Sequence, residues 1–178
     1  MNKENPLLIM ATGTGKTIVM ASLAQKLPGH TLFLAHRDEL ISQLIARFHS
    51  VTGAEPSREQ SVFTADKLSR YVVASVQTMQ KERLKRWDAS KFSFIFTDEA
   101  HHSAARSYKN IYSHFFTAQH IGATATPDRA DGSSLPVYTK IGYQYPLHKA
   151  IRWCACANHW QTGPQPDHGS QFVACCCW

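Results

Sequence analysis

The stretch Met10-Ala11-Thr12-Gly13-Thr14-Gly15-Lys16-Thr17 decides which fold this chain adopts. It follows the apolar run at residues 7–9 and opens into a segment whose apolar residues recur at helical spacing. This order of strand, loop and helix is the context that a phosphate-binding loop requires. Gly13 and Gly15 let the backbone pass close to a polyphosphate, and the N-terminus of the helix turns its positive dipole end toward the same anion.

Two side chains of this stretch suit a nucleotide with a bound magnesium ion. Lys16 can reach the β- and γ-phosphates, and the hydroxyl of Thr17 is a suitable magnesium ligand. The usual pattern also has a glycine five positions before Gly15, where this sequence has Met10. A flexible Gly/Thr loop without a ligand stays open as an alternative. A dinucleotide-binding turn is disfavoured, because its third glycine would fall at Ile18.

Length and composition describe one globular domain with a sizeable core, because the chain has 178 residues, of which 43% are hydrophobic and 18% charged. It contains no run of about 18 apolar residues, so no membrane span is expected. Residues 1–6 lack the apolar segment of a signal peptide, which predicts a cytoplasmic location. The net charge of +6 is compatible with a polyanionic partner and equally with a merely soluble surface.

Apolar runs that read as strands alternate with segments of helical spacing along the chain. Beyond the strand that precedes the glycine-rich stretch, we expect strands at residues 31–35, 71–75, 92–96 and 120–123, and at most a short strand at 61–64. We expect helices at residues 40–48, 76–87 and 107–116. This alternation predicts an α/β fold with a doubly wound, mostly parallel sheet, whose functional residues lie at the carboxyl ends of the strands.

Two of the expected helices carry further signals. Asp38 can cap the helix at 40–48, because its carboxylate can accept a hydrogen bond from the first helical turn. The helix at 76–87 is strongly basic through Lys81, Arg83, Lys85 and Arg86. For this helix a solvated face is favoured over a DNA-binding face.

The pair Asp98-Glu99 directly follows a strongly apolar strand, so both carboxylates project where a strand ends. An aspartate at that place can hold magnesium, and the adjacent glutamate can orient and deprotonate an attacking water. Taken alone, the pair could also be an ordinary acidic turn. Together with the glycine-rich loop it forms the second half of a magnesium–nucleotide site.

Five segments, in this order along the chain, resemble the motifs of superfamily 2 helicases, most closely the DEAH-containing group of restriction-enzyme motor subunits and excision-repair helicases. Residues 11–17, 98–102 and 122–127 resemble motifs I, II and III, residues 34–40 resemble motif Ia, and residues 74–78 resemble the segment that touches the nucleic-acid backbone. The resemblance covers roughly residues 7–151. In that family the position of Ala11 is often not glycine, so the missing glycine at Met10 is no argument against a phosphate-binding loop.

The resemblance implies a RecA-like P-loop NTPase lobe with ATP and Mg²⁺ as cofactors. It implies that phosphates and magnesium are held by Gly13, Thr14, Gly15, Lys16, Thr17 and Asp98, with Thr17 and Asp98 on the metal. It assigns the attacking water to Glu99, which makes Lys16, Asp98 and Glu99 the catalytic set. It implies that His101, Thr124 and Thr126 link the nucleotide site to the bound nucleic acid. It implies that Arg37, Gln77 and Thr78 face the nucleic-acid backbone. A zinc site at His101 and His102 is disfavoured, because no partner with ligand spacing lies nearby.

Motors of this family have two such lobes, and the second lobe supplies arginine fingers. Nothing after residue 151 resembles this second lobe. The segment that usually recognises adenine, upstream of the first strand, is also missing. We therefore expect the ATP-binding lobe of a superfamily 2 DNA helicase or translocase, with little activity alone. The alternative is a nucleotide- and nucleic-acid-binding module without turnover; a P-loop ATPase unrelated to nucleic acid is disfavoured by motifs Ia and III. The expected partners are nucleic acid, DNA more than RNA, and a second lobe or subunit on another chain, with no membrane.

The last 27 residues differ in composition from the rest, because they hold three of the four tryptophans and all five cysteines, Cys154, Cys156, Cys175, Cys176 and Cys177. Residues 1–151 are expected to be the ATP-binding domain, incomplete at its C-terminal end after a helix at 145–151, and residues 152–178 an irregular tail. A zinc site there is disfavoured by the cysteine spacing, and disulfides by the expected compartment. The favoured interpretation is that the tail is not helicase sequence, through a frameshift or a truncated gene model.

Overall fold

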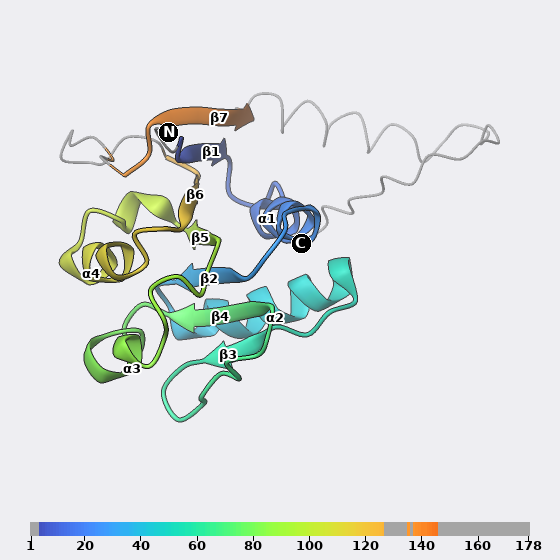
Figure 1. Ribbon diagram of the computed structural model, residues 1–178. Helices are drawn as coiled ribbons and strands as arrows, with labels where there is room; N and C mark the ends of the chain where they lie inside the picture. The colour runs from blue at the N-terminus through green and yellow to red at the C-terminus, as the bar shows by residue number, and fades with distance from the viewer. Residues whose placement is uncertain (1–3, 127–134, 136, 146–178) are drawn as a thin grey trace, which may run out of the picture.

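The computed structural model describes residues 4–126, 135 and 137–145 (Figure 1). Its strands are β1 (Pro6–Met10), β2 (Thr31–Ala35), β3 (Ser57–Glu59), β4 (Tyr71–Ser75), β5 (Phe94–Asp98), β6 (Gln119–Thr124) and β7 (Lys140–Tyr145). Its helices are α1 (Lys16–Lys26), α2 (Asp38–Thr52), α3 (Lys81–Lys85), α4 (Arg106–His114) and the short 3-10 helix η1 (Ala100–His102). Apart from Tyr145, which ends β7, the expected helix at 145–151 and the tail lie outside the described residues.

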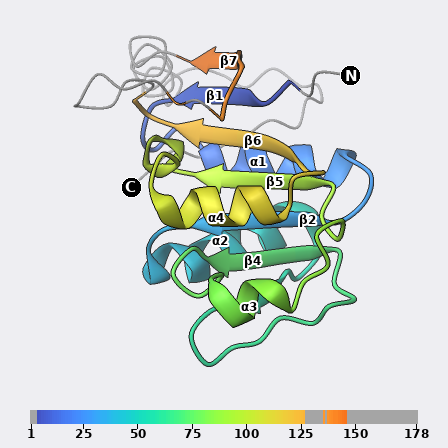
Figure 2. The same cartoon turned by 60° about the vertical axis from the view of Figure 1, so that its left-hand side comes forward.

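The described strands form one seven-stranded sheet in the order β3-β4-β2-β5-β6-β1-β7. Every pairing between neighbouring strands is parallel, so the arrows in Figure 2 share one direction. Parallel strands have their carboxyl ends at the same edge of the sheet, and ligands of such sheets bind there. The segments that follow β1, β2, β4, β5 and β6 therefore meet at one edge, which confirms the predicted α/β fold.

Helices cover both faces of the sheet. Figures 1 and 2 show α1 and α2 together on one face and α3 and α4 on the other. Strand β2 shows why both faces are covered, because all five of its residues are buried. Leu32 and Leu34 belong to the core beneath α3 and α4, whereas Phe33 and Ala35 belong to the core beneath α1 and α2. A strand buried on both faces is a continuous apolar run, as its sequence predicted.

The predicted helices differ from the observed ones in two respects. Helix α2 begins at Asp38 and its N-cap residue is Arg37, without a side-chain cap bond, so the predicted cap at Asp38 is wrong. The predicted helix at 76–87 is also wrong, since only Lys81–Lys85 is helical. Lys81 has a φ of 46°, which is left-handed and interrupts any continuous helix through it. The Gln80 amide donates to the Ser107 carbonyl oxygen and so holds this break against α4.

The strand predicted at 61–64 is wrong as well. Gln60 and Phe63 exchange backbone hydrogen bonds of 3.1 and 2.7 Å, which makes this segment a tight turn. The strand in this region is the shorter and earlier β3, which pairs with β4. Strand β5 begins at Phe94 rather than Phe92, and β7 is an additional strand beside β1 that the sequence did not indicate.

Within the described part of the chain, no helix is both long and apolar enough to cross a membrane.

Candidate functional site

The glycine-rich loop joins β1 to α1 at the carboxyl edge of the sheet. Gly13 and Gly15 have φ angles of 82° and 85°, a left-handed conformation that glycine adopts without steric cost. Both the backbone N–H and the hydroxyl of Thr14 donate to the Ala11 carbonyl oxygen, at 3.2 and 2.7 Å. Gly15 is the N-cap of α1, so the helix starts at Lys16 with its first N–H groups turned toward the loop. This is the backbone geometry of an anion-binding helix start.

Lys16 connects this loop to the acidic pair across an intervening strand. Its Nζ lies 3.4 Å from Oε1 of Glu99, although β6 separates β1 from β5 in the sheet. The Lys16 side chain is only 9% exposed and that of Glu99 is 30% exposed. The two segments that were expected to share a nucleotide are thus brought together by a direct ionic contact.

Asp98 ends β5 and is partly buried. Its Oδ1 accepts a hydrogen bond of 2.9 Å from the backbone N–H of Glu99. Burial, and then the adjacent charge of Glu99, raise the pKa of Asp98 above its usual value. A divalent cation at this carboxylate would counter both causes, and magnesium takes one or two protein oxygens beside phosphate and water. The donor set of Asp98 and Thr17 therefore fits a magnesium ion.

Glu99 adopts a backbone conformation that few residues other than glycine adopt. Its φ of 50° and ψ of 54° are left-handed, which costs about 1–2 kcal/mol for an L-residue. The residue then starts the short helix η1, and its carboxylate lies between Lys16 and the ring of His101, 3.3 Å from Nδ1. Strain of this kind persists where surrounding contacts fix the residue, often at functional sites.

His101 connects the acidic segment to the end of β6. Its Nδ1 lies 3.1 Å from the hydroxyl of Thr124. That hydroxyl donates to the Thr126 carbonyl oxygen at 2.8 Å and accepts from the Thr126 N–H at 3.2 Å. The structure thus brings the three expected coupling residues together. Among the described residues there is no group of three or more His, Cys, Asp or Glu that could hold a metal ion.

A polar hollow of about 390 Å³ lies farther along the same edge. It is lined by His36, Arg37, Glu39, Gln77 and His102. Two of the expected nucleic-acid residues, Arg37 and Gln77, therefore share one hollow. The Gln77 amide donates to the His36 carbonyl oxygen and its Oε1 accepts from the Ser75 hydroxyl at 2.7 Å. These bonds fix the Gln77 side chain in place.

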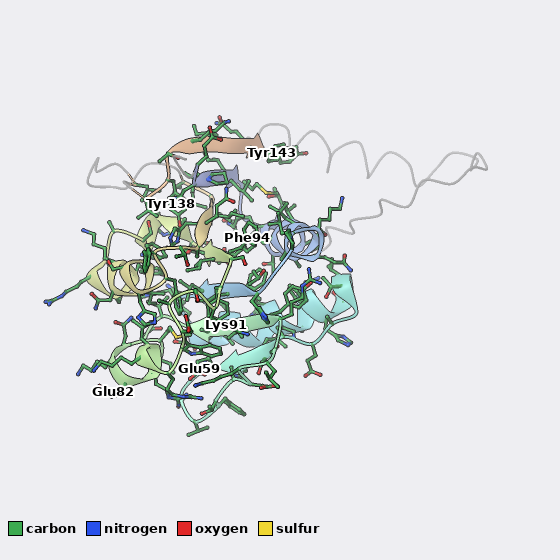
Figure 3. The ribbon with its side chains drawn as sticks, in the orientation of Figure 1. Glu59, Glu82, Lys91, Phe94, Tyr138 and Tyr143 are labelled. Atoms are coloured by element: carbon green, nitrogen blue, oxygen red, sulfur yellow. The ribbon has the colours of Figure 1, made fainter. Side chains whose placement is uncertain are left out.

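Thr78, the third expected nucleic-acid residue, is not among the residues that line this hollow. Its hydroxyl accepts a hydrogen bond of 2.9 Å from the backbone N–H of Ser61. The basic helix beside it is largely neutralised by its own contacts: Arg83 binds buried Glu59, Arg86 lies 3.7 Å from Glu59, and Lys85 binds Glu82. Figure 3 labels Glu59 and Glu82 in this corner. The contacts favour a structural role over a DNA-binding face.

Sequence reasoning missed three residues that line the hollow: His36, Glu39 and His102. His36 and Glu39 belong to the segment that resembles motif Ia, and His102 was considered only as a disfavoured zinc ligand. No periodicity or spacing shows that residues 36 and 102 are neighbours. The only local signal for His102 was that it directly follows His101, and this pair suggested a zinc site, which was disfavoured, and not a contact with His36.

A phosphate loop after β1 and an Asp-Glu pair after β5, joined through Lys16 on a parallel sheet, define an ATP-binding P-loop NTPase domain of the RecA-like class. The family model described as "Type III restriction enzyme, res subunit" matches residues 1–129. The chain belongs to this family, and it is the first RecA-like domain of a superfamily 2 helicase.

Individual relatives agree with this assignment. The candidate ATP-dependent helicase IRC3 of Saccharomyces cerevisiae is 36% identical over 153 residues, which cover 75% of this chain and 22% of IRC3. The UvsW helicase of bacteriophage T4 is similar in fold, with a TM-score of 0.62 at 20% identity over 80% of this chain and 55% of that chain. The restriction-modification enzyme LlaGI, solved with a DNA substrate mimic, has a TM-score of 0.60 at 18% identity over 90% of this chain and 19% of that chain. The chain spans about a quarter of the length of the curated relatives that it matches.

Proposed function

We propose that this domain binds Mg²⁺–ATP at residues 11–17 and DNA at the polar hollow, as the nucleotide-binding lobe of a DNA helicase or translocase. The single observation that carries the proposal is the contact of 3.4 Å between Lys16 and Glu99, because it joins the phosphate loop to a carboxylate that can act on water. Neither the phosphate loop nor the Asp98-Glu99 pair alone would indicate a site for ATP hydrolysis.

Each residue of the site has a distinct role in this proposal. Lys16 and the N–H groups at the start of α1 bind the phosphates, and Thr17 and Asp98 would hold the magnesium ion. The ion supplies charge neutralisation on the phosphate oxygens. Glu99 orients the attacking water and accepts its proton. Lys16 must turn from Glu99 toward the phosphates as they bind, which frees the carboxylate for that role.

DNA is the proposed polymer because the hollow combines the Arg37 cation with the fixed amide of Gln77, and because LlaGI, similar in fold, is known with a DNA substrate mimic. Arg37 and Gln77 would bind the phosphate backbone, so binding should weaken steeply with salt and depend little on sequence. Thr78 would stay close to that backbone at the end of β4, with its hydroxyl already bonded to Ser61.

Turnover in this class depends on arginine fingers from a second lobe, which are worth about 10³–10⁵ in rate. We therefore propose slow hydrolysis by the 178-residue chain alone, and completion of the site by a second RecA-like lobe. An ATPase assay with and without single- and double-stranded DNA separates this from a binding module that never turns over.

Titration calorimetry with a non-hydrolysable ATP analogue and Mg²⁺ tests the nucleotide site. The Lys16→Ala variant should bind at least about tenfold more weakly, because a hydrogen bond to a charged group contributes about 1.5–3 kcal/mol. Lys26→Ala is a matched control, since Lys26 lies in the last turn of the same helix. Unchanged affinity of the Lys16→Ala variant would contradict the site assignment.

A further inference from the structure

The ring of His102 contacts two other histidine rings. Its centroid is 4.1 Å from that of His101, its neighbour in η1, at an interplanar angle of 45°. It is also stacked on His36, at 4.9 Å and 27°. His36 follows β2, so this contact joins two strand ends that are 66 residues apart in sequence. Offset aromatic stacking at this distance is an attractive and orientation-dependent contact.

The two outer histidines lead to different sites. His101 reaches Glu99 at 3.3 Å and Thr124 at 3.1 Å, on the nucleotide side. His36 accepts the Gln77 amide bond through its carbonyl oxygen, in the polar hollow. A continuous path of contacts therefore runs from Lys16 through Glu99 and the three histidines to Gln77.

Burial in the hydrophobic core does not explain the position of His102, because the residue is exposed and lines the hollow itself. Desolvation, and then the neighbouring His101 and His36, lower the pKa of His102, so its ring is mostly neutral at neutral pH. A neutral His102 ring can pack against His36 and His101 without adding a charge at these contacts. His102 therefore joins the two polar sites through ring contacts alone.

We infer that the His36–His102 stack couples the two sites, with His102 as the positioning residue that transmits nucleotide binding at Lys16 to the DNA-binding hollow at Gln77. The inference rests on the proposed function. A nucleotide that draws Lys16 away from Glu99 changes the partners of Glu99 and hence of His101. The ring of His102 lies against His101, so the change reaches His36 and the backbone that holds Gln77.

Such coupling is a ratio of affinities and is reciprocal between the two ligands. Fluorescence anisotropy with a labelled single-stranded 20-mer DNA, with and without a non-hydrolysable ATP analogue and Mg²⁺, measures it in the full chain. The wild-type chain should show a change in DNA affinity of about 5-fold or more on nucleotide addition. His102→Ala should bring this factor close to 1 while the nucleotide alone binds within about threefold of wild type.

Two further variants separate coupling from a general loss of structure. His102→Phe keeps an aromatic ring in the stack and should retain most of the coupling factor, whereas exposed His49→Ala in α2 should leave it unchanged. A wild-type chain that binds both ligands without coupling, or a His102→Ala variant with the full coupling factor, would overturn the inference. A wild-type chain that does not bind the nucleotide at all would instead overturn the proposed function.

Discussion

Two cation–carboxylate pairs in this domain have the same chemistry and different surroundings. Glu59, at the end of β3, is fully buried and binds Arg83, and its second oxygen accepts the Ala65 N–H at 2.9 Å. Glu99, after β5, is partly exposed and lies 3.4 Å from Lys16. The first pair lies under the turn that follows β3, and the second lies at the mouth of the phosphate loop.

The difference lies in how completely each cation is bonded. Besides Glu59, the Arg83 guanidinium donates to Phe63 O at 3.1 Å, to Thr64 Oγ1 at 3.2 Å and to Ser61 O. These bonds hold the turn against α3. Arg83 cannot exchange Glu59 for another partner without leaving the buried carboxylate unpaired. Among the described residues Lys16 has a single carboxylate partner, at the longer distance of 3.4 Å, which leaves its ammonium able to bind another anion. A fully bonded pair stabilises structure, and an incompletely bonded pair can serve a ligand.

The largest expected effect comes from breaking the buried pair. Arg83→Ala leaves the Glu59 carboxylate in the interior without its main partner, which should lower the free energy of unfolding by about 3–5 kcal/mol. Urea denaturation measures it. Lys85→Ala, which breaks the exposed pair with Glu82 on the same helix, is the control and should shift the midpoint little. Equal shifts in the two variants would show that Glu59 is not a buried anchor.

Lys16→Ala should give the opposite pattern. Without ligand the variant should unfold within about 1 kcal/mol of wild type, since the lost pair is partly exposed. With Mg²⁺ and an ATP analogue at 100 times the wild-type Kd, the wild type gains about 2.7 kcal/mol, and a variant that binds at least tenfold more weakly should gain about 1.4 kcal/mol or less. Thermal unfolding with and without nucleotide measures both. A variant that nucleotide stabilises as much as the wild type would contradict the comparison.

Close packing beneath Glu99 should matter more than its ion pair. A Cβ added to Gly122 would lie 2.5 Å from the Tyr138 ring and 2.9 Å from Cβ of Ala100. Figure 3 labels Tyr138 beside this strand. Gly122→Ala should therefore cost about 1–3 kcal/mol of unfolding free energy, measured by urea denaturation. In a Tyr138→Leu background, Gly122→Ala should cost less unfolding free energy than it does in the wild type. An equal cost in both backgrounds would argue against this contact.

The smallest expected effect is a change in pH dependence at His102. Its pKa in the folded chain is lower than the ordinary 6.5, so the unfolded state takes up its proton first as the pH falls. Stability from this group is therefore complete above pH 6.5 and is lost as the pH drops toward the folded value. His102→Phe should show a smaller decrease in urea midpoint between pH 7.5 and pH 5 than wild type. Identical decreases would mean that His102 does not titrate differently on folding.

Local signals predicted the nucleotide side of the domain well. The strand, loop and helix around Gly15 and the strand before Asp98 are recognisable from short apolar runs and glycine positions, and the structure confirms them. The contact of Lys16 with Glu99 follows from a parallel sheet, because both residues lie at carboxyl ends of strands. The roles of these residues in binding and catalysis stay predictions.

The Glu59 side of the domain was not predictable, for a physical reason. Strand β3 has the sequence Ser-Arg-Glu, which contains no apolar residue to indicate a strand. Glu59 is buried only because Arg83, 24 positions later, neutralises it, and such pairing leaves no local pattern. Strand β7 was missed because all but one of its residues are exposed, so it lacks the buried run that marked the other strands.

The place of β1 in the sheet has a consequence for synthesis on the ribosome. Its neighbours are β6 and β7, and Leu7 pairs with Gly122, which is translated 115 residues later. At about 5–20 residues per second, that interval is roughly 6–23 s. During this time Leu7, Leu8 and Ile9 have no sheet to join, although β2 and β4 can already pair. The phosphate loop thus leaves the ribosome well before the strands that fix its final position, and a chaperone that binds short apolar segments would find its target there.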